Sequence, residues 1–279
     1  MSTWTCTLLR SGRFRLDGGS MFGVVPKAVW SRLITPDADN CIPLQTNCLL
    51  LELDGSRVLV ETGNGTKWTD KERAIYGMEE RGIETALGEV GVAPEQIDLV
   101  IVTHLHFDHA GGLTRIAPNG ELAPTFPQAE IVVQKQEWED AMANRSTMSG
   151  TYLRSHLDPI SDKVRLIDGE AMITDGLRVC PTPGHTWGHQ AVLFEDQDGT
   201  ICFPGDLIPT RNHVGRAWSM GYDMLPHDTL LTKQSLLNRA ADEGWRLILD
   251  HEPGEPMVSV EHDESKAWFR FASTRTPLH

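Results

Sequence analysis

A run of apolar residues ends directly on a cluster of metal-ligand side chains. Residues 98–103 carry Leu-Val-Ile-Val at their centre and predict a strand buried on both faces. The next residues place His104, His106, Asp108 and His109 in the pattern H-x-H-x-D-H. If the strand continued through His104 and His106, both rings would project to one side and converge on one ion. Asp108 and His109 would then face a second ion nearby.

The chemistry of this cluster indicates a metal centre. The chain has 11 histidines, and three of them crowd into six residues beside an aspartate, which fits a set of ordinary hydrogen-bonding histidines poorly. Imidazole and carboxylate ligands suit zinc, iron or manganese. The sequence therefore predicts a metal site and leaves the metal open.

Three further candidate ligands follow other predicted strands. His185 comes after the strand 177–182 and a Pro-Gly turn, Asp206 comes after the strand 200–203 and a second Pro-Gly turn, and His251 ends the strand 245–249. Each residue alone is typical of an ordinary strand end. Asp206 offers two oxygens and could bridge two ions, so the three together would complete two sites.

The remaining pattern indicates one α/β domain. Apolar residues make up 40% and charged residues 23% of the chain, a globular composition. A hairpin is predicted over 47–61, a helix over 82–92, and a second helix that Asp228 caps. Strands and helices recur in both halves without a linker, so we expect a single domain over residues 1–279.

The order of the motifs carries a family resemblance. HLHFDH at 104–109, PGHT at 183–186, PGD at 204–206 and the late His251 resemble the motifs of the metallo-β-lactamase superfamily. The resemblance spans residues 47–251 and implies an αββα sandwich with the metals at one edge between two sheets. It implies two divalent ions, expected to be zinc. It assigns His104, His106 and His185 to one ion, Asp108, His109 and His251 to the other, and Asp206 to both.

Within that superfamily, the chain most resembles hydrolases of lactones. Asp206 separates it from true β-lactamases, which generally lack the bridging aspartate, and His106 separates it from diiron reductases, which carry glutamate there. Residues 18–27, 205–210 and 220–223 look like the quorum-quenching N-acyl homoserine lactonases. The resemblance implies that a hydroxide shared by two metals attacks a lactone or ester carbonyl. The alternatives are an organophosphate triester, a thioester as in glyoxalase II, and a metal-bound binding protein without turnover.

One position departs from the lactonase pattern. Several lactonases carry a tyrosine three residues after the bridging aspartate, where this chain has Pro209. Tyr222 and His213 are the candidates to replace that group, and the alternative is that both only shape the pocket. Asp108 is also a candidate to accept or shuttle a proton. His189 is either a partner of a ligand or an ordinary strand residue.

Charge and cysteine content limit the kinds of binding partner and the cellular location that we expect. Lys and Arg total 25 against 39 Asp and Glu, and the net charge of −14 disfavours nucleic acid and anionic membranes. No stretch of about 18 apolar residues occurs in the sequence, and residues 1–16 have no apolar run long enough for a signal sequence, so we expect neither a membrane span nor a signal. The five cysteines are scattered and form no C-x-x-C pair. We therefore expect a cytoplasmic enzyme with a small-molecule substrate, and a homodimer on general grounds.

Overall fold

Two sheets lie face to face in the computed structural model, which describes residues 3–148 and 150–274. Within these residues the first sheet has six strands and the second has seven. The first sheet runs in the order β1 (Thr5–Asp17), β2 (Cys41–Leu53), β3 (Ser56–Val60), β4 (Leu99–Ile101), β7 (Glu130–Gln134) and β8 (Val164–Ile167). The second runs β15 (Trp268–Ser273), β14 (Met257–Asp263), β13 (Arg246–Ile248), β12 (Gly199–Phe203), β11 (Gln190–Asp196), β10 (Leu177–Pro181) and β9 (Ala171–Thr174).

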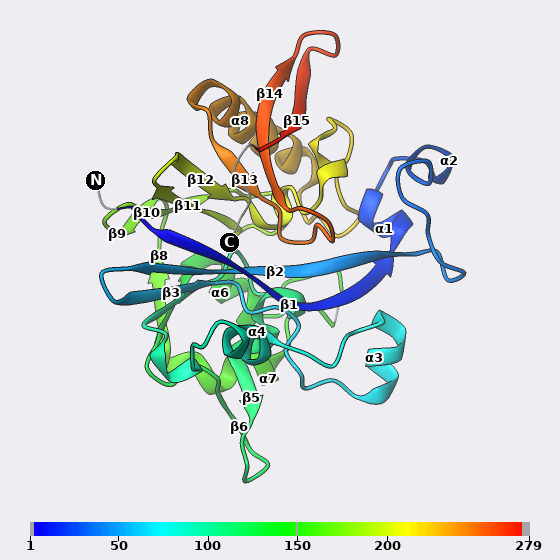
Figure 1. Cartoon of the computed structure of the whole chain (residues 1–279). Helices are drawn as coiled ribbons and strands as arrows, with labels where there is room; N and C mark the ends of the chain where they lie inside the picture. The colour runs from blue at the N-terminus through cyan, green and yellow to red at the C-terminus, as the bar shows by residue number, and fades with distance from the viewer. Residues whose placement is uncertain (1–2, 149, 275–279) are drawn as a thin grey trace.

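Helices cover the outer faces of both sheets (Figure 1). Below the first sheet in the figure lie α4 (Ile83–Glu89) and α7 (Arg154–Leu157), and above the second lies α8 (Pro226–Glu243). The other helices are α1 (Gly18–Phe22), α2 (Lys27–Trp30), α3 (Asp70–Tyr76), α5 (Phe107–Ala110) and α6 (Lys135–Met142). A small hairpin joins β5 (Thr114–Ile116) to β6 (Leu122–Pro124). The layers form the αββα sandwich that the family resemblance implied.

Alternation along the strands places apolar side chains on both faces of each sheet. On β2, Leu49 and Leu51 pack between the sheets with Phe194 and Phe203 of the second sheet. Their neighbour Leu50 points to the opposite face, where it packs with α4 and α6. The outer face of the second sheet is covered by α8, which contributes leucines and an alanine to a third cluster. Each sheet therefore has apolar residues on both faces, and the strand predicted at 98–103 contributes Val100 to one face and Ile101 to the other, as its sequence predicted.

The parallel strand pairs determine where the ligands gather. In the first sheet β3, β4 and β7 run parallel, and in the second β12 and β13 run parallel. The carboxyl ends of parallel neighbours meet at one edge of a sheet. The segments that follow β4, β12 and β13 carry His104, Asp206 and His251. This topology is the reason that residues more than a hundred positions apart in sequence lie together.

Several sequence predictions need correction. The helix predicted from Asp228 begins at Pro226, and its N-cap Leu225 makes no side-chain bond, because proline fixes the first helical turn and places Asp228 inside it. The long strand β1 and the hairpin β14–β15 were not predicted, since charged residues interrupt their apolar pattern. The hairpin over 47–61 is confirmed, and so is the helix within 82–92.

Among the described residues, no helix is both long and apolar enough to cross a membrane. The predicted loop 144–150 is described except at position 149, and the predicted domain extends past the described residues at both ends. The single domain, the homodimer and the cytoplasmic location stay predictions.

Candidate metal centre

The loop after β4 brings the first two histidines inward. The strand ends at Ile101, so His104 and His106 do not lie on it, and the prediction that strand alternation aligns them is wrong. Backbone anchors align them instead. Glu61 Oε1 accepts a hydrogen bond of 2.7 Å from the Thr103 backbone N–H, and Glu137 Oε1 accepts one of 2.9 Å from the Leu105 N–H. The two buried carboxylates therefore set the path of the loop between them.

Short turns present the other predicted ligands. Asp108 and His109 lie in the four-residue helix α5, directly after this loop. The turn after β12 passes through Gly205 at a φ of +55°, which a residue with a side chain rarely adopts, and a Cβ there would lie 2.8 Å from the side chain of Thr103. Gly205 thus lets Asp206 approach the β4 loop. His251 follows the end of β13 after Leu249 and Asp250, without a glycine turn.

The two oxygens of Asp206 face two separate groups of histidines. Oδ2 lies 3.0 Å from His185 Nε2 and 3.8 Å from His104 Nε2. Oδ1 lies 3.1 Å from His251 Nε2 and 3.7 Å from His109 Nε2. This geometry is what a carboxylate between two cations requires. It follows the division of ligands that the family resemblance implied.

Each group has the donors for one divalent ion. In the first, which we call the first cation site, His104, His106, His185 and Asp206 place one ligand atom each within 4.8 Å of all the others. In the second, His109, Asp206, Asp250 and His251 do the same. Asp108 lies beside the second group, 3.6 Å from His251 Nε2 and 3.8 Å from His109 Nε2. Asp108 as a ligand stays a prediction, and Asp250 is an additional carboxylate there.

The donor atoms fit cations because they lack other partners. His106 Nδ1 faces His185 Nε2 at 3.0 Å, and His109 Nε2 faces His251 Nε2 at 3.2 Å. Two ring nitrogens at such distances need a proton or a cation between them. His104 Nε2 is buried and has no hydrogen-bond partner. Buried donors and acceptors are nearly always paired, so these residues fit a metal such as zinc.

The far sides of the rings are held by other groups. His185 Nδ1 lies 3.0 Å from Asp223 Oδ1, and His251 Nδ1 lies 2.9 Å from the Gln45 carbonyl oxygen. His109 Nδ1 lies 3.4 Å from Glu61 Oε2. Such partners fix which ring nitrogen carries the proton and leave the other one for a metal. Glu61 adopts a φ of +67°, a strained conformation for a residue with a side chain.

Burial and carboxylates shift the histidines in opposite directions. Burial and neighbouring histidines lower the pKa of His104 and His106 well below the usual value, so these rings are neutral and have a lone pair to donate. Burial also opposes a charge on His185, but Asp206 and Asp223 outweigh it and raise its pKa to about 10. For Asp206 itself, burial opposes the charge, but His185 and His251 hold its pKa well below the usual value. Asp206 is therefore ionised and has both oxygens available as acceptors.

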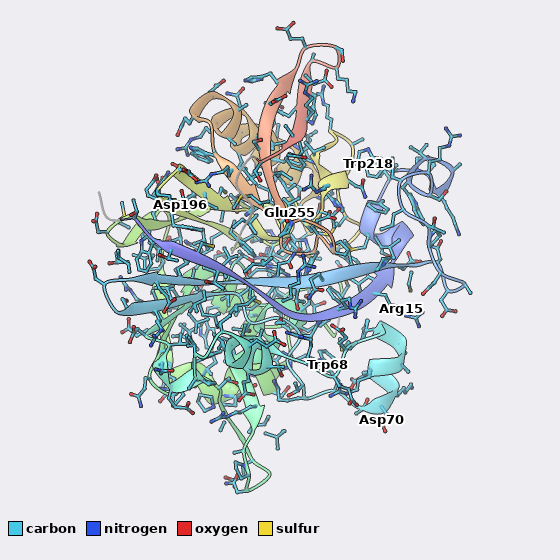
Figure 2. All side chains as sticks on the ribbon, in the orientation of Figure 1. Arg15, Trp68, Asp70, Asp196, Trp218 and Glu255 are labelled. Atoms are coloured by element: carbon cyan, nitrogen blue, oxygen red, sulfur yellow. The ribbon has the colours of Figure 1, made fainter. Side chains whose placement is uncertain are left out.

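A cavity of about 230 Å³ opens onto the centre. Its floor contains His106, Asp108, His185, Asp206 and His251. Its walls are mainly apolar and aromatic side chains, among them Leu16, Met21, Tyr76, Phe107, Met148, Met220 and Tyr222. Two tryptophans labelled in Figure 2 lie behind the cavity. Trp68, beside α3, packs on the lining residue Phe107, and Trp218, near α1, packs on Phe22, which adjoins the lining residue Met21. The shape suits a ligand with an apolar part and a polar reactive end.

Tyr222 and His213, the two candidates to replace the missing tyrosine, have different surroundings. Tyr222 lines the cavity, and burial raises its pKa to about 12. His213 does not line it: its Nδ1 lies 2.8 Å from Thr210 Oγ1 and its Nε2 lies 2.8 Å from the Met21 carbonyl oxygen. Its ring also stacks on Phe22. These contacts occupy both nitrogens of His213 and favour a packing role.

His189 lies behind the ligands. Its ring centroid is 5.2 Å from that of His104, and its Nδ1 lies 2.8 Å from Thr182 Oγ1. Burial and the nearby His185 lower its pKa to about 3, so the ring is neutral. It packs against a ligand ring without a hydrogen bond to it.

Sequence reasoning missed Glu61, Asp223 and Asp250. Glu61 ends a predicted strand, as the ligands do, and Asp250 directly precedes His251, so their positions carried a signal. Asp223 lies in the segment 220–223 that resembles the lactonases, but nothing in its loop pattern indicates that it contacts His185.

Comparisons with known proteins agree with this geometry. The family model described as the metallo-beta-lactamase superfamily matches residues 41–251. An N-acyl homoserine lactonase of Bacillus sp is 33% identical over 215 residues, which are 73% of this chain and 75% of the relative. The crystal structure of a probable metal-dependent hydrolase from Staphylococcus aureus has a TM-score of 0.87 at 28% identity and covers 99% of both chains. AidC, a dizinc quorum-quenching lactonase in complex with a product, has a TM-score of 0.79 at 18% identity, covering 99% of this chain and 96% of its own, and shares the fold.

Proposed function

Because the chain belongs to the metallo-β-lactamase superfamily and is a metal-dependent hydrolase, we propose that it is a dinuclear zinc lactonase that opens N-acyl homoserine lactones. One observation carries the proposal. The two oxygens of Asp206 face two groups of histidines at the floor of a cavity with apolar walls. Relatives named N-acyl homoserine lactonase, from Bacillus cereus among others, support the substrate class.

In this reaction the apolar walls of the cavity would bind the acyl chain, and the polar floor would hold the reacting carbonyl. Met21, Met148 and Met220 line the cavity and form a surface for an acyl chain, where methionines adapt to chains of different shape. Met21 and Phe22 belong to one buried cluster, and of the two only Met21 also lines the cavity. The apolar walls also exclude water from the carbonyl, which strengthens electrostatic interactions at the floor.

The hydrolysis adds the oxygen of water to the carbonyl carbon and breaks the bond to the ring oxygen, which must gain a proton. Bound zinc ions would lower the pKa of water toward about 7 and polarise the carbonyl. Asp108, at the floor, is positioned to receive a proton from the attacking water. Tyr222 Oη holds its proton at neutral pH, because burial raises its pKa to about 12. Several lactonases carry a tyrosine where this chain has Pro209. We assign to Tyr222 the hydrogen bond to the substrate oxygen that such a tyrosine would donate.

A substrate panel tests the proposal. Purified protein reconstituted with zinc is assayed against N-acyl homoserine lactones of several chain lengths, an aryl ester, an aryl phosphotriester and an acyl thioester. We expect the highest kcat/KM for the lactones. A higher kcat/KM for the phosphotriester or the thioester would reassign the enzyme to that substrate, and the absence of lactone turnover by zinc-loaded protein would reject the proposal.

A further inference from the structure

A buried carboxylate outside the predicted ligand set lies behind the first cation site. Glu137, in the first turn of α6, has no exposed surface. Its Oε1 accepts hydrogen bonds from the Leu105 backbone N–H at 2.9 Å and from the Tyr152 hydroxyl at 3.1 Å. Its Oε2 accepts one of 2.6 Å from the Thr186 hydroxyl. Three donors therefore occupy both oxygens.

These contacts join segments that each carry part of the site. Leu105 lies between His104 and His106, and Thr186 directly follows His185. Glu137 therefore connects the two loops that bring three histidines to one cation. Tyr152 adds a third segment, because it follows the cavity-lining Thr151 and its ring centroid lies 5.1 Å from that of His106.

The loop that carries His185 packs closely on the start of α6. A Cβ on Gly188 would lie 2.1 Å from the backbone nitrogen of Glu137, so only glycine allows this approach. From the other side, the Arg145 guanidinium stacks 3.8 Å from the ring centroid of Trp187. The position of Glu137 relative to the His185 loop is therefore fixed by contacts that do not involve its own side chain.

None of the three hydrogen-bond donors of Glu137 carries a positive charge. Burial raises the pKa of Glu137, and the His185 ring favours its charged form. A ring that binds a metal must give up the proton on the ligating nitrogen, so a bound metal would replace the positive charge of His185 as the partner of Glu137. Without either, the buried charge behind these loops would be costly.

We propose that Glu137 is a positioning residue of the metal centre. It holds the loops around His106 and His185 in register, and its charge favours a cation at the first cation site. The inference rests on the proposed metal binding and is independent of the substrate. Removing the carboxylate should therefore weaken metal binding before any reaction is considered.

The test measures metal affinity directly. The zinc dissociation constant is obtained by competition with a chromophoric chelator, and the ligand geometry is followed by the absorption spectrum of the cobalt(II)-substituted protein. We expect Glu137→Ala to raise the dissociation constant of the first cation site about 10-fold or more and to change the cobalt spectrum. Glu137→Gln keeps one acceptor for Leu105 but loses the charge, so its affinity should lie between those of Glu137→Ala and the parent.

A matched control separates positioning from general destabilisation. Asp196, labelled in Figure 2, is a partly buried carboxylate that pairs with Arg246 at the far end of β11, about 20 Å along the strand from the site. Asp196→Ala should lower the melting temperature and leave zinc affinity unchanged. If Glu137→Ala does not fold, Thr186→Val removes one of the three hydrogen bonds and should weaken zinc binding about threefold.

Two outcomes would overturn the inference. One is a folded Glu137→Ala protein whose zinc affinity and cobalt spectrum match the parent within twofold. The other, where only Thr186→Val folds, is an unchanged affinity in that variant. Loss of zinc binding by the parent protein would instead reject the proposed metal centre itself.

Discussion

Removal of the metals should make the stability of this protein fall as the pH rises above 7. In the metal-free centre, burial opposes charge on His185 and His251, but the Asp206, Asp223 and Asp250 carboxylates outweigh it and raise the two pKa values to about 10 and about 9. Both values exceed the ordinary pKa of about 6.5. The folded state therefore binds more protons than the unfolded state. The stability that results is fully present below pH 6.5 and is lost as the pH rises toward 9 and 10.

The magnitude follows from three histidines, because Glu61, Asp108 and Asp206 also outweigh burial and raise the pKa of His109 well above the ordinary value. Between pH 7 and 8 these rings stay charged in the folded protein and are mostly neutral in the unfolded chain. Each ring then lowers the free energy of unfolding by about 1.4 kcal/mol per pH unit, which gives roughly 3–4 kcal/mol in total. The buried Lys67 and Lys233, with pKa values lowered to about 8 by burial, act in the opposite direction chiefly above pH 8.

Urea denaturation followed by the fluorescence of the eight tryptophans measures this difference. Chelated and zinc-loaded proteins are compared at pH 7 and pH 8. The loaded protein should change much less, because bound metals require neutral ring nitrogens. His185→Asn should reduce the loss in the chelated protein by about a third. A chelated protein whose stability is constant or rises between pH 7 and 8 would refute the reasoning.

Three substitutions test other parts of the centre. Asp223→Ala removes the acceptor at 3.0 Å from His185 Nδ1 and should weaken zinc binding about 10-fold to 100-fold, measured by chelator competition. Asp223→Asn keeps an acceptor and should lose less zinc affinity. Equal losses of affinity in the two variants would contradict the role of the hydrogen bond. Tyr222→Phe should lower kcat for a lactone about 100-fold at unchanged zinc content, and an unchanged kcat would remove Tyr222 from the mechanism. Gly205→Ala should destabilise the protein by about 1–3 kcal/mol in thermal unfolding, because the φ is +55° and a Cβ would lie 2.8 Å from Thr103. Gly120→Ala, also at positive φ but with open space around it, is the control and should cost less; equal costs would exclude the contact as the cause.

The sequence allowed the ligands to be predicted because they end strands. His104 and His106 follow a strand recognisable from its apolar run, and Pro-Gly turns mark His185 and Asp206. Their grouping around the two oxygens of Asp206 depends on the parallel pairing of β12 with β13, which no local pattern specifies. The αββα layers came from the family resemblance, because alternation alone does not say which faces of the strands meet.

The residues that could not be predicted act across long sequence distances. Glu137 contacts Leu105 and Thr186, which lie 32 and 49 residues away, and a buried glutamate at the start of a helix looks like an ordinary helix residue. Asp228 illustrates the opposite error: the local capping signal was present, but Pro226 begins the helix two residues earlier. His213 was selected by its place in a loop, and only its contacts with Thr210 and Met21 show that both ring nitrogens are occupied.

The most direct test of the central claim is the release of acid as N-hexanoyl-L-homoserine lactone is opened. If the protein is a dinuclear zinc lactonase, the zinc-loaded protein should release acid steadily. Acid release should stop when the zinc is chelated and return when two equivalents of zinc are added back. Acid release that persists unchanged after the metals are removed, or its absence in protein shown to hold two zinc ions, would contradict the account.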